Sequence, residues 1–155
     1  MTTSETPNLG VYLAHEEMRD SQIEMIVDGI DSLSERGFLL AAAPTGIGKT
    51  AASLASALHV ANNRGENGLK PKIVFMTGRQ SQHRIVVDTV RMINSRLPSG
   101  IPRVKLVDII GREGMCEVID KSTGKCDCEK GTTEEGRQRK RGIMRDIILS
   151  EPQHV

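Results

Sequence analysis

The sequence feature that constrains the fold most is a glycine-containing loop between an apolar run and a helix-like run. The loop reads Ala-Pro-Thr-Gly-Ile-Gly-Lys-Thr over residues 43–50, directly after the apolar residues 37–42 and directly before the helical pattern of residues 51–61. Two glycines separated by one residue let main-chain N–H groups gather around an anion, and the following helix directs its positive N-terminal end at the same point. The pattern therefore predicts a phosphate-binding loop between a buried strand and a helix.

Each polar residue of this loop has a role that follows from its chemistry. We expect Lys49 to contact the β- and γ-phosphates of a nucleotide and Thr50 to supply a hydroxyl ligand for Mg²⁺, and these two are the candidate catalytic residues. The other loop residues expected to bind the nucleotide are Pro44, Thr45, Gly46, Ile47 and Gly48. The alternative is a Gly-Lys-Thr turn that occurs by chance, but the flanking strand and helix patterns are the context that a phosphate loop requires.

The rest of the chain alternates between helix-like and strand-like segments. Apolar residues recur at helical spacing in three segments, which run from Arg19 to near Gly37, over 51–61 and over 81–97. Short apolar runs predict three strands at 38–42, 72–76 and 104–110. Strands separated by helices pair in parallel through right-handed crossovers, and ligands bind at the carboxyl ends of such strands. We therefore expect an α/β fold in which a parallel sheet is flanked by helices.

Length and composition are those of an ordinary soluble domain. The chain has 155 residues, of which 37% are hydrophobic, so it is long enough to bury a core. No apolar stretch approaches the roughly 20 residues that span a bilayer. Residues 1–7 lack the basic and apolar pattern of a signal peptide. We expect a cytoplasmic protein that does not associate with membranes.

Charge is distributed unevenly along the chain although the net charge is only +1. Residues 1–36 contain eight acidic and two basic side chains, whereas residues 64–112 contain ten basic and three acidic ones. A cationic block next to a phosphate loop suits a nucleic-acid backbone, because Lys and Arg contacts release condensed counterions. The alternative is a solvated helix face. The basic segment 137–145 leaves the same two interpretations open.

The cysteines are clustered in a polar segment. Cys116, Cys126 and Cys128 lie within thirteen positions, among Gly, Lys, Asp and Thr residues. In a cytoplasmic protein this clustering favours metal ligation or a reactive thiol over a disulfide. Structural zinc sites and iron–sulfur clusters both require four ligands, so three cysteines leave each set incomplete unless His154 completes a zinc site. Three unligated thiols in a loop remain the alternative.

Four short motifs, in order along the chain, resemble those of the XPD-like iron–sulfur DNA helicases of superfamily 2, a group that includes the DinG type. The motifs are Arg19-Asp20-Ser21-Gln22, the loop at residues 43–50, Thr77-Gly78-Arg79-Gln80-Ser81-Gln82, and Gly111-Arg112-Glu113-Gly114-Met115-Cys116. The phosphate loop is similar to the family's form, which has alanine where the strict pattern has glycine. The third motif departs from the family's usual order at Gly78 and Arg79.

The resemblance implies a RecA-like P-loop NTPase layer and a role for each motif. Arg19 and Gln22 would bind the nucleotide, with Gln22 reading the adenine edge. The residues that would contact the DNA backbone are Thr77, Arg79, Gln82 and Arg112. Cys116, Cys126 and Cys128 would be three ligands of a 4Fe–4S cluster, for which the chain contains no fourth cysteine.

Taken together, these expectations describe the N-terminal, ATP-binding part of an ATP-dependent DNA helicase, associated with DNA repair. The expected parts are a flexible arm at 1–14, a partial ATP-binding domain at 15–111, a partial iron–sulfur insertion at 112–135, and a basic helix and tail at 136–155. ATP, Mg²⁺ and a 4Fe–4S cluster are the implied cofactors. Single-stranded or forked DNA and the remaining helicase domains, supplied by another chain, are the implied partners.

Enzymatic turnover is left open, because the family's Asp-Glu-x-His box has no counterpart in the sequence. Two other interpretations stay open as well. One is a non-catalytic nucleotide- or DNA-binding remnant, and the other is a zinc-stabilised binding module.

Overall fold

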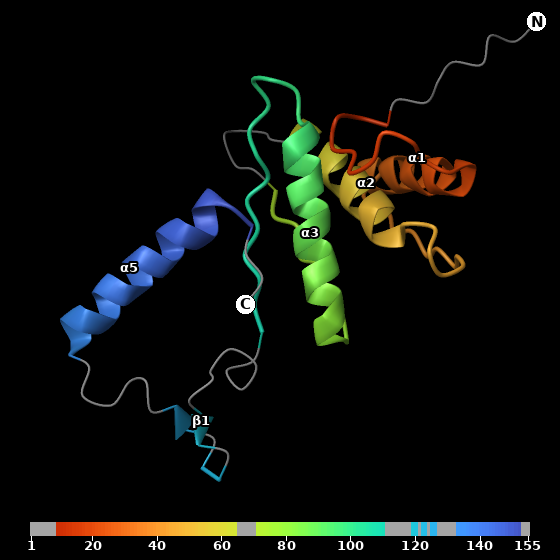
Figure 1. Ribbon diagram of the computed structural model, residues 1–155. Coiled ribbons are helices and arrows are strands. Elements are labelled where there is room, and N and C mark those ends of the chain that lie inside the picture. Colours follow the sequence, from red (N-terminus) through yellow and green to blue (C-terminus); the bar gives the residue numbers. More distant parts are fainter. Residues whose placement is uncertain are drawn as a thin grey trace, which may run out of the picture.

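Four helices and one small hairpin make up the part of the chain that the structure describes. The computed structural model describes residues 9–64, 71–110, 119–120, 122–123, 125–126 and 133–152. The helices are α1 (Asp20–Ser34), α2 (Lys49–Asn63), α3 (Gln80–Arg96) and α5 (Glu134–Ser150), and the strands are β1 (Ile119–Asp120) and β2 (Lys125–Cys126) (Figure 1). The helices predicted from the apolar periodicity are therefore confirmed, each to within a few residues.

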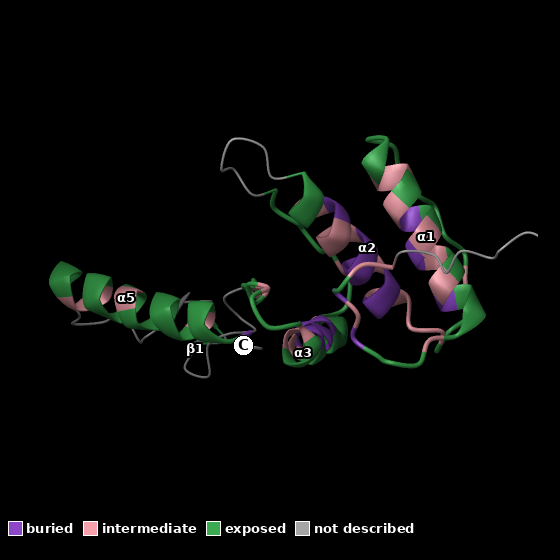
Figure 2. Cartoon of the chain, turned by 90° about the horizontal axis from the view of Figure 1, so that it is seen from above, coloured by how far each residue is buried: buried purple, intermediate pink, exposed green. Residues whose placement is uncertain are grey.

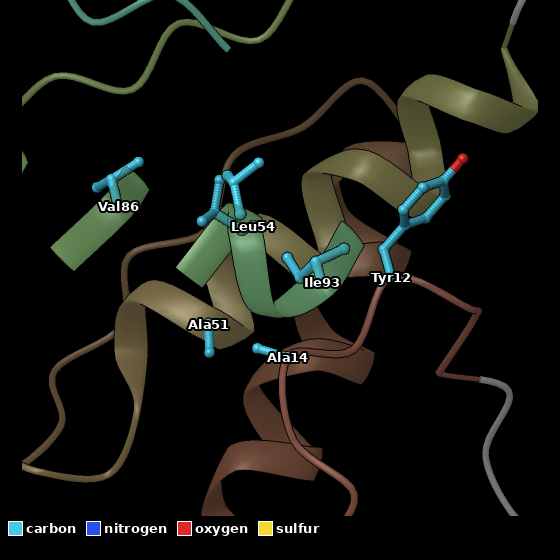
Figure 3. Close-up of a cluster of buried hydrophobic side chains, with 7 residues drawn as sticks. Tyr12, Ala14, Ala51, Leu54, Val86 and Ile93 are labelled. Carbon is cyan, nitrogen blue, oxygen red and sulfur yellow. The ribbon is translucent and has the colours of Figure 1, made fainter. Parts of the chain in front are cut away.

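Helix α2 lies between α1 and α3 and shares a small core with each (Figure 2). On the α1 side, Ile26 is buried against Ala52 and Ala55 of α2. On the α3 side, a larger cluster joins the N-terminal segment, α2 and α3, and its members are Tyr12, Ala14, Ala51, Leu54, Val86, Val90 and Ile93 (Figure 3). Small residues on α2 let both neighbours approach it closely, which makes this helix the centre of the fold.

Gly29 of α1 packs tightly against Ser56 of α2. A Cβ atom built on Gly29 would lie 2.7 Å from the Ser56 hydroxyl oxygen and 2.9 Å from the Ser56 Cβ. These separations are below ordinary van der Waals contact, so the two helices pack here because residue 29 has no side chain. The packing of α1 on α2 also brings the start of α1 to the loop before α2.

The predicted parallel sheet is wrong. Within the described residues, the only sheet is the antiparallel pair of β1 and β2, in which Ile119 pairs with Cys126 and Asp120 with Lys125. The segments 38–42, 72–76 and 104–110 form no strand. A RecA-like layer, which requires such a sheet behind the phosphate loop, is therefore not the observed fold.

These three segments have the composition of strands but lack strand neighbours. Exposure alternates along Ile73, Val74, Phe75 and Met76, at 39%, 78%, 40% and 87%, as expected for an extended chain with one face covered. The main chain of residues 73–76 makes no hydrogen bond with any described residue. A strand is stabilised by lateral hydrogen bonds to a neighbour, and a continuous apolar run cannot supply that neighbour by itself.

The β1–β2 hairpin closes with a local side-chain turn. Asp120 Oδ1 accepts hydrogen bonds from the Ser122 hydroxyl at 2.6 Å and from the Ser122 main-chain N–H at 2.9 Å. These bonds favour the ionised carboxylate and lower the pKa of Asp120. The turn lies in the segment expected to form the iron–sulfur insertion, most of which is outside the described residues.

Most of helix α5 stands apart from α1, α2 and α3 in both views (Figures 1 and 2), and the chain directly after it returns to α3, where Arg91 Nε donates to the Pro152 carbonyl oxygen at 2.9 Å. None of its residues is buried, and Met144 and Ile147 are about half exposed. The expectation that Met144 and Ile147 pack inward is therefore wrong. Ile148 is partly buried, and it lines a pocket together with Arg91 and Asn94 of α3, so only the end of α5 meets another part of the described structure. Thr133 caps the helix by accepting a hydrogen bond from Gly136 N at 3.2 Å.

Candidate phosphate-binding site

The loop at residues 43–50 contains two glycines, Gly46 and Gly48, whose backbone conformation favours glycine. Gly46 has φ +87° and Gly48 has φ +86°, in the left-handed region that side chains disfavour. Gly48 is the N-cap residue of α2, and no side chain makes a capping hydrogen bond at this helix start in the described structure. The sequence pattern Gly-Ile-Gly therefore forms a tight turn that leads directly into the positive end of a 15-residue helix.

The first main-chain donors of α2 and of the loop before it have no acceptor in the described structure. The main-chain N–H groups of residues 46–51 donate to no acceptor among the described residues, and the first bonded amide is Ala52 N, which donates to the Gly48 carbonyl at 3.0 Å. Unpaired amides that follow left-handed glycines form a concave, anion-attracting surface. The loop thus presents the donor set that a phosphate group requires.

Lys49 lies folded over the start of this loop. Its ammonium donates to the carbonyl oxygen of Ala43 at 2.8 Å and to that of Pro44 at 2.7 Å. Both bonds hold a positive charge within the loop, where it can attract an anion. Binding a phosphate would exchange these neutral carbonyl partners for a charged one.

The first turn of α1 lies against the same loop. Arg19, the N-cap of α1, donates from Nη1 to the Gly46 carbonyl oxygen at 2.7 Å across 27 residues of sequence. Gln22 is only 5% exposed, and its Nε2 lies 2.8 Å from the position that a Cβ on Gly48 would occupy. The structure therefore brings together Arg19, Gln22 and the loop, which the sequence motifs predicted as one site.

The remaining loop residues differ in exposure. Thr50 is the second residue of α2 and is partly buried, as is Ile47, whereas Pro44 and Thr45 are exposed. Within the described residues, no group of three or more His, Cys, Asp or Glu side chains could hold a metal ion by itself.

Three of the predicted DNA-contacting residues, Thr77, Arg79 and Gln82, lie together at the start of α3. Arg79 is the N-cap of α3, and its N–H lies 3.4 Å from the Thr77 hydroxyl oxygen. The Thr77 hydroxyl donates to the Gln82 amide oxygen. These three residues are thus brought together, while Arg112 lies outside the described residues. The side chains of Cys116, Cys126 and Cys128 also lie outside them, although the main chain of Cys126 belongs to β2.

A second polar feature was not anticipated from the sequence. His83 Nδ1 in α3 lies 2.6 Å from Asp108 Oδ1, and the two side chains are 21% and 6% exposed. The pair links α3 to the segment 104–110 beside a groove of about 1020 Å³, which is lined by residues 73–78, 106–110 and one face of α3. His83 and Asp108 are 25 positions apart in the sequence. The one sequence signal for this pair is that Asp108 is an acidic residue within the apolar segment 104–110.

Comparison of the chain with protein-family models, with curated proteins and with solved structures finds no match. In the described parts of the chain, none of the helices combines the length and the apolar character needed to cross a bilayer.

Proposed function

We propose that this chain binds a magnesium–nucleoside triphosphate through the loop at residues 43–50. The observation that carries the proposal is the set of N–H groups at residues 46–51 that have no acceptor among the described residues and lie around two left-handed glycines at the start of α2. Such a donor set binds phosphate oxygens, and the helix dipole adds to the attraction. Gln22 adds an amide that makes no hydrogen bond with any described residue and faces the same loop.

Lys49 supplies the charge in this proposal. Its ammonium leaves the carbonyls of Ala43 and Pro44 and pairs with the terminal phosphates, which are stronger acceptors because they are charged. Thr50 offers the hydroxyl that would contact Mg²⁺. A cation bound there would neutralise part of the phosphate charge.

ATP is the proposed nucleotide and a DNA helicase the proposed context, both on the strength of the motif resemblance. For triphosphate binding, the support from the described residues is the joint placement of Arg19, Gln22 and the phosphate loop, and for DNA contact it is the polar turn at the start of α3 that contains Thr77, Arg79 and Gln82. DNA is the proposed partner of that turn. Turnover is not proposed for this chain alone, because the carboxylate that would orient the attacking water has no counterpart in the sequence.

Isothermal titration calorimetry with Mg–ATP tests the proposal. We expect saturable binding by the unmodified chain and a loss of roughly 10- to 100-fold in affinity for Lys49→Ala, since a charge-assisted hydrogen bond is removed. Lys105→Ala is the matched control, because Lys105 is an exposed lysine on the segment 104–110 and should leave the affinity unchanged. If the unmodified chain does not bind Mg–ATP, the loop is not a working nucleotide site, and the interpretation as a non-catalytic remnant is favoured.

The cysteine cluster is a separate proposal. Cys116, Cys126 and Cys128 would provide three ligands of a 4Fe–4S cluster, and a fourth ligand would come from outside this set. Metal and sulfide analysis after anaerobic purification distinguishes the cases, because iron with sulfide supports the cluster and stoichiometric zinc supports the zinc-stabilised module.

A further inference from the structure

We infer that the site recognises the phosphate chain of its ligand and is indifferent to the base. This inference rests on the proposed nucleotide binding, and it departs from the adenine-reading role that the motif resemblance implies for Gln22. Its basis is the position of Gln22 and Arg19, which both face the glycine turn of the loop.

The Gln22 amide is directed at the loop. Its Nε2, Cδ and Oε1 lie 2.8, 3.3 and 3.6 Å from the position of a Cβ on Gly48, so the whole amide group covers that glycine. Reading a base edge requires the amide to present its N–H donor and its oxygen acceptor together to an outside ring. A side chain that is 5% exposed and covers Gly48 is poorly placed for that, whereas its amide can donate to a phosphate oxygen bound at the loop.

Arg19 also contacts the loop directly. Its guanidinium donates to the Gly46 carbonyl oxygen at 2.7 Å, which braces the left-handed turn and places a permanent positive charge beside the free amides. The charge attracts a polyanion whatever group the polyanion carries. Arg19 is therefore a positioning residue for the loop in this inference.

The chain also provides no packed aromatic platform for a base at this loop. It contains one tyrosine, two phenylalanines and no tryptophan. Tyr12 is buried in the core beside Ile93 (Figure 3), and Phe75 lines the groove over α3. Phe38 is 91% exposed and so lacks packing support. Stacking, the usual sequence-tolerant contact with bases, thus has no preformed surface among these rings.

The ligand class that follows is a magnesium-bound linear triphosphate. ATP, GTP and inorganic tripolyphosphate each contain a linear triphosphate, and they differ only in the group attached to it. Sites that hydrogen-bond a specific polar group discriminate strongly against ligands that lack it, because their own polar groups are then left unpaired. A site without such contacts treats the three ligands alike.

Calorimetric titration of the whole chain with Mg–ATP, Mg–GTP and Mg–tripolyphosphate tests the inference. We expect dissociation constants that agree within about threefold. A preference of more than about tenfold for ATP over both other ligands would overturn the inference while leaving nucleotide binding intact. Failure of all three to bind would instead defeat the proposed function, and the inference with it.

Gln22→Glu sharpens the test, because it keeps the shape of the side chain and places a negative charge beside the phosphates. We expect it to weaken binding of all three ligands by the same factor, of about tenfold or more. If Gln22 read adenine, the substitution would weaken ATP and leave tripolyphosphate unchanged, and that result would contradict us. Gln138→Glu, at an exposed position in α5, is the matched control for the added charge. Circular dichroism of each variant shows whether the helices are retained.

Discussion

The side-chain amide of Asn94 pairs with the main chain of Val104 through two hydrogen bonds. Val104 N donates to Asn94 Oδ1 at 2.8 Å, and Asn94 Nδ2 donates to the Val104 carbonyl oxygen at 3.0 Å. Asn94 of α3 therefore satisfies both the main-chain N–H and the main-chain carbonyl of Val104, as a neighbouring strand would do in a sheet. The pair holds the start of the segment 104–110 against the helix, in the absence of any ladder.

Asn94→Ala should destabilise the protein by about 1–3 kcal/mol, because it leaves a part-buried N–H and C=O of Val104 without partners. Urea unfolding measures the change. Asn63→Ala is the control, since Asn63 bonds only to an exposed His59 nitrogen at 3.0 Å and its loss should cost little. Equal effects of the two substitutions would show that the Asn94 pair is not formed in solution.

Gly29→Ala should destabilise the protein by about 1–3 kcal/mol, since the new Cβ would overlap Ser56 at the α1–α2 crossing. Thermal unfolding is the measurement. Gly142→Ala provides the matched control, because Gly142 lies in α5 with no atom within 4 Å of the added Cβ. That substitution should stabilise α5 slightly, as alanine favours helix over glycine. Ser56→Gly combined with Gly29→Ala should recover most of the loss, and no recovery would argue against this crossing.

Stability should fall as the pH rises above about 10 because of Tyr12. Burial among apolar side chains raises the pKa of Tyr12 above its ordinary value of 10.0, so the folded state holds the phenolic proton more tightly than the unfolded state does. The stabilisation is complete below pH 10.0 and is lost as the pH rises through the folded-state pKa. Denaturation of the unmodified chain and of Tyr12→Phe at several alkaline pH values isolates this contribution. Parallel curves for the two proteins would contradict the prediction.

The unpaired apolar segment 73–76 should promote self-association. Met76 and Val74 are 87% and 78% exposed, and the main chain of residues 73–76 has no hydrogen-bond partner in the part of the chain that the structure describes. Exposed strand-like edges of this kind template pairing with other chains. Met76→Lys should therefore lower the concentration-dependent association seen by analytical ultracentrifugation. Ile85→Lys, at an apolar position within helix α3 that is 53% exposed, is the control and should have a smaller effect.

The helices were predictable because the information for them is local. In α3, Val86, Val90 and Ile93 recur on one face, and this spacing fits only a helix with a buried side. The loop was predictable for the same reason, since Gly46 and Gly48 permit a backbone that other residues resist. The proximity of Gln22 to Gly48 was expected only from motif order, because nothing in the spacing of residues 22 and 48 places them together.

The prediction of three strands was wrong because an apolar, β-branched composition does not by itself supply a neighbouring strand to pair with. Segments 38–42, 72–76 and 104–110 are as apolar as buried strands, yet none of them pairs with a strand among the described residues. For Asp108 in the last segment, the nearby partner is His83 on a helix. No periodicity in the sequence could identify that pair.

The sequence alone therefore determined the helices and the shape of the glycine turn, since both depend on interactions within a few residues. Tertiary packing determined which surfaces meet: α1 crosses α2 at Gly29, and that crossing brings Arg19 and Gln22 to the loop. It also left three apolar segments without a sheet. The difference is physical, because backbone preferences act along the chain, whereas contacts between distant residues depend on where every other element packs.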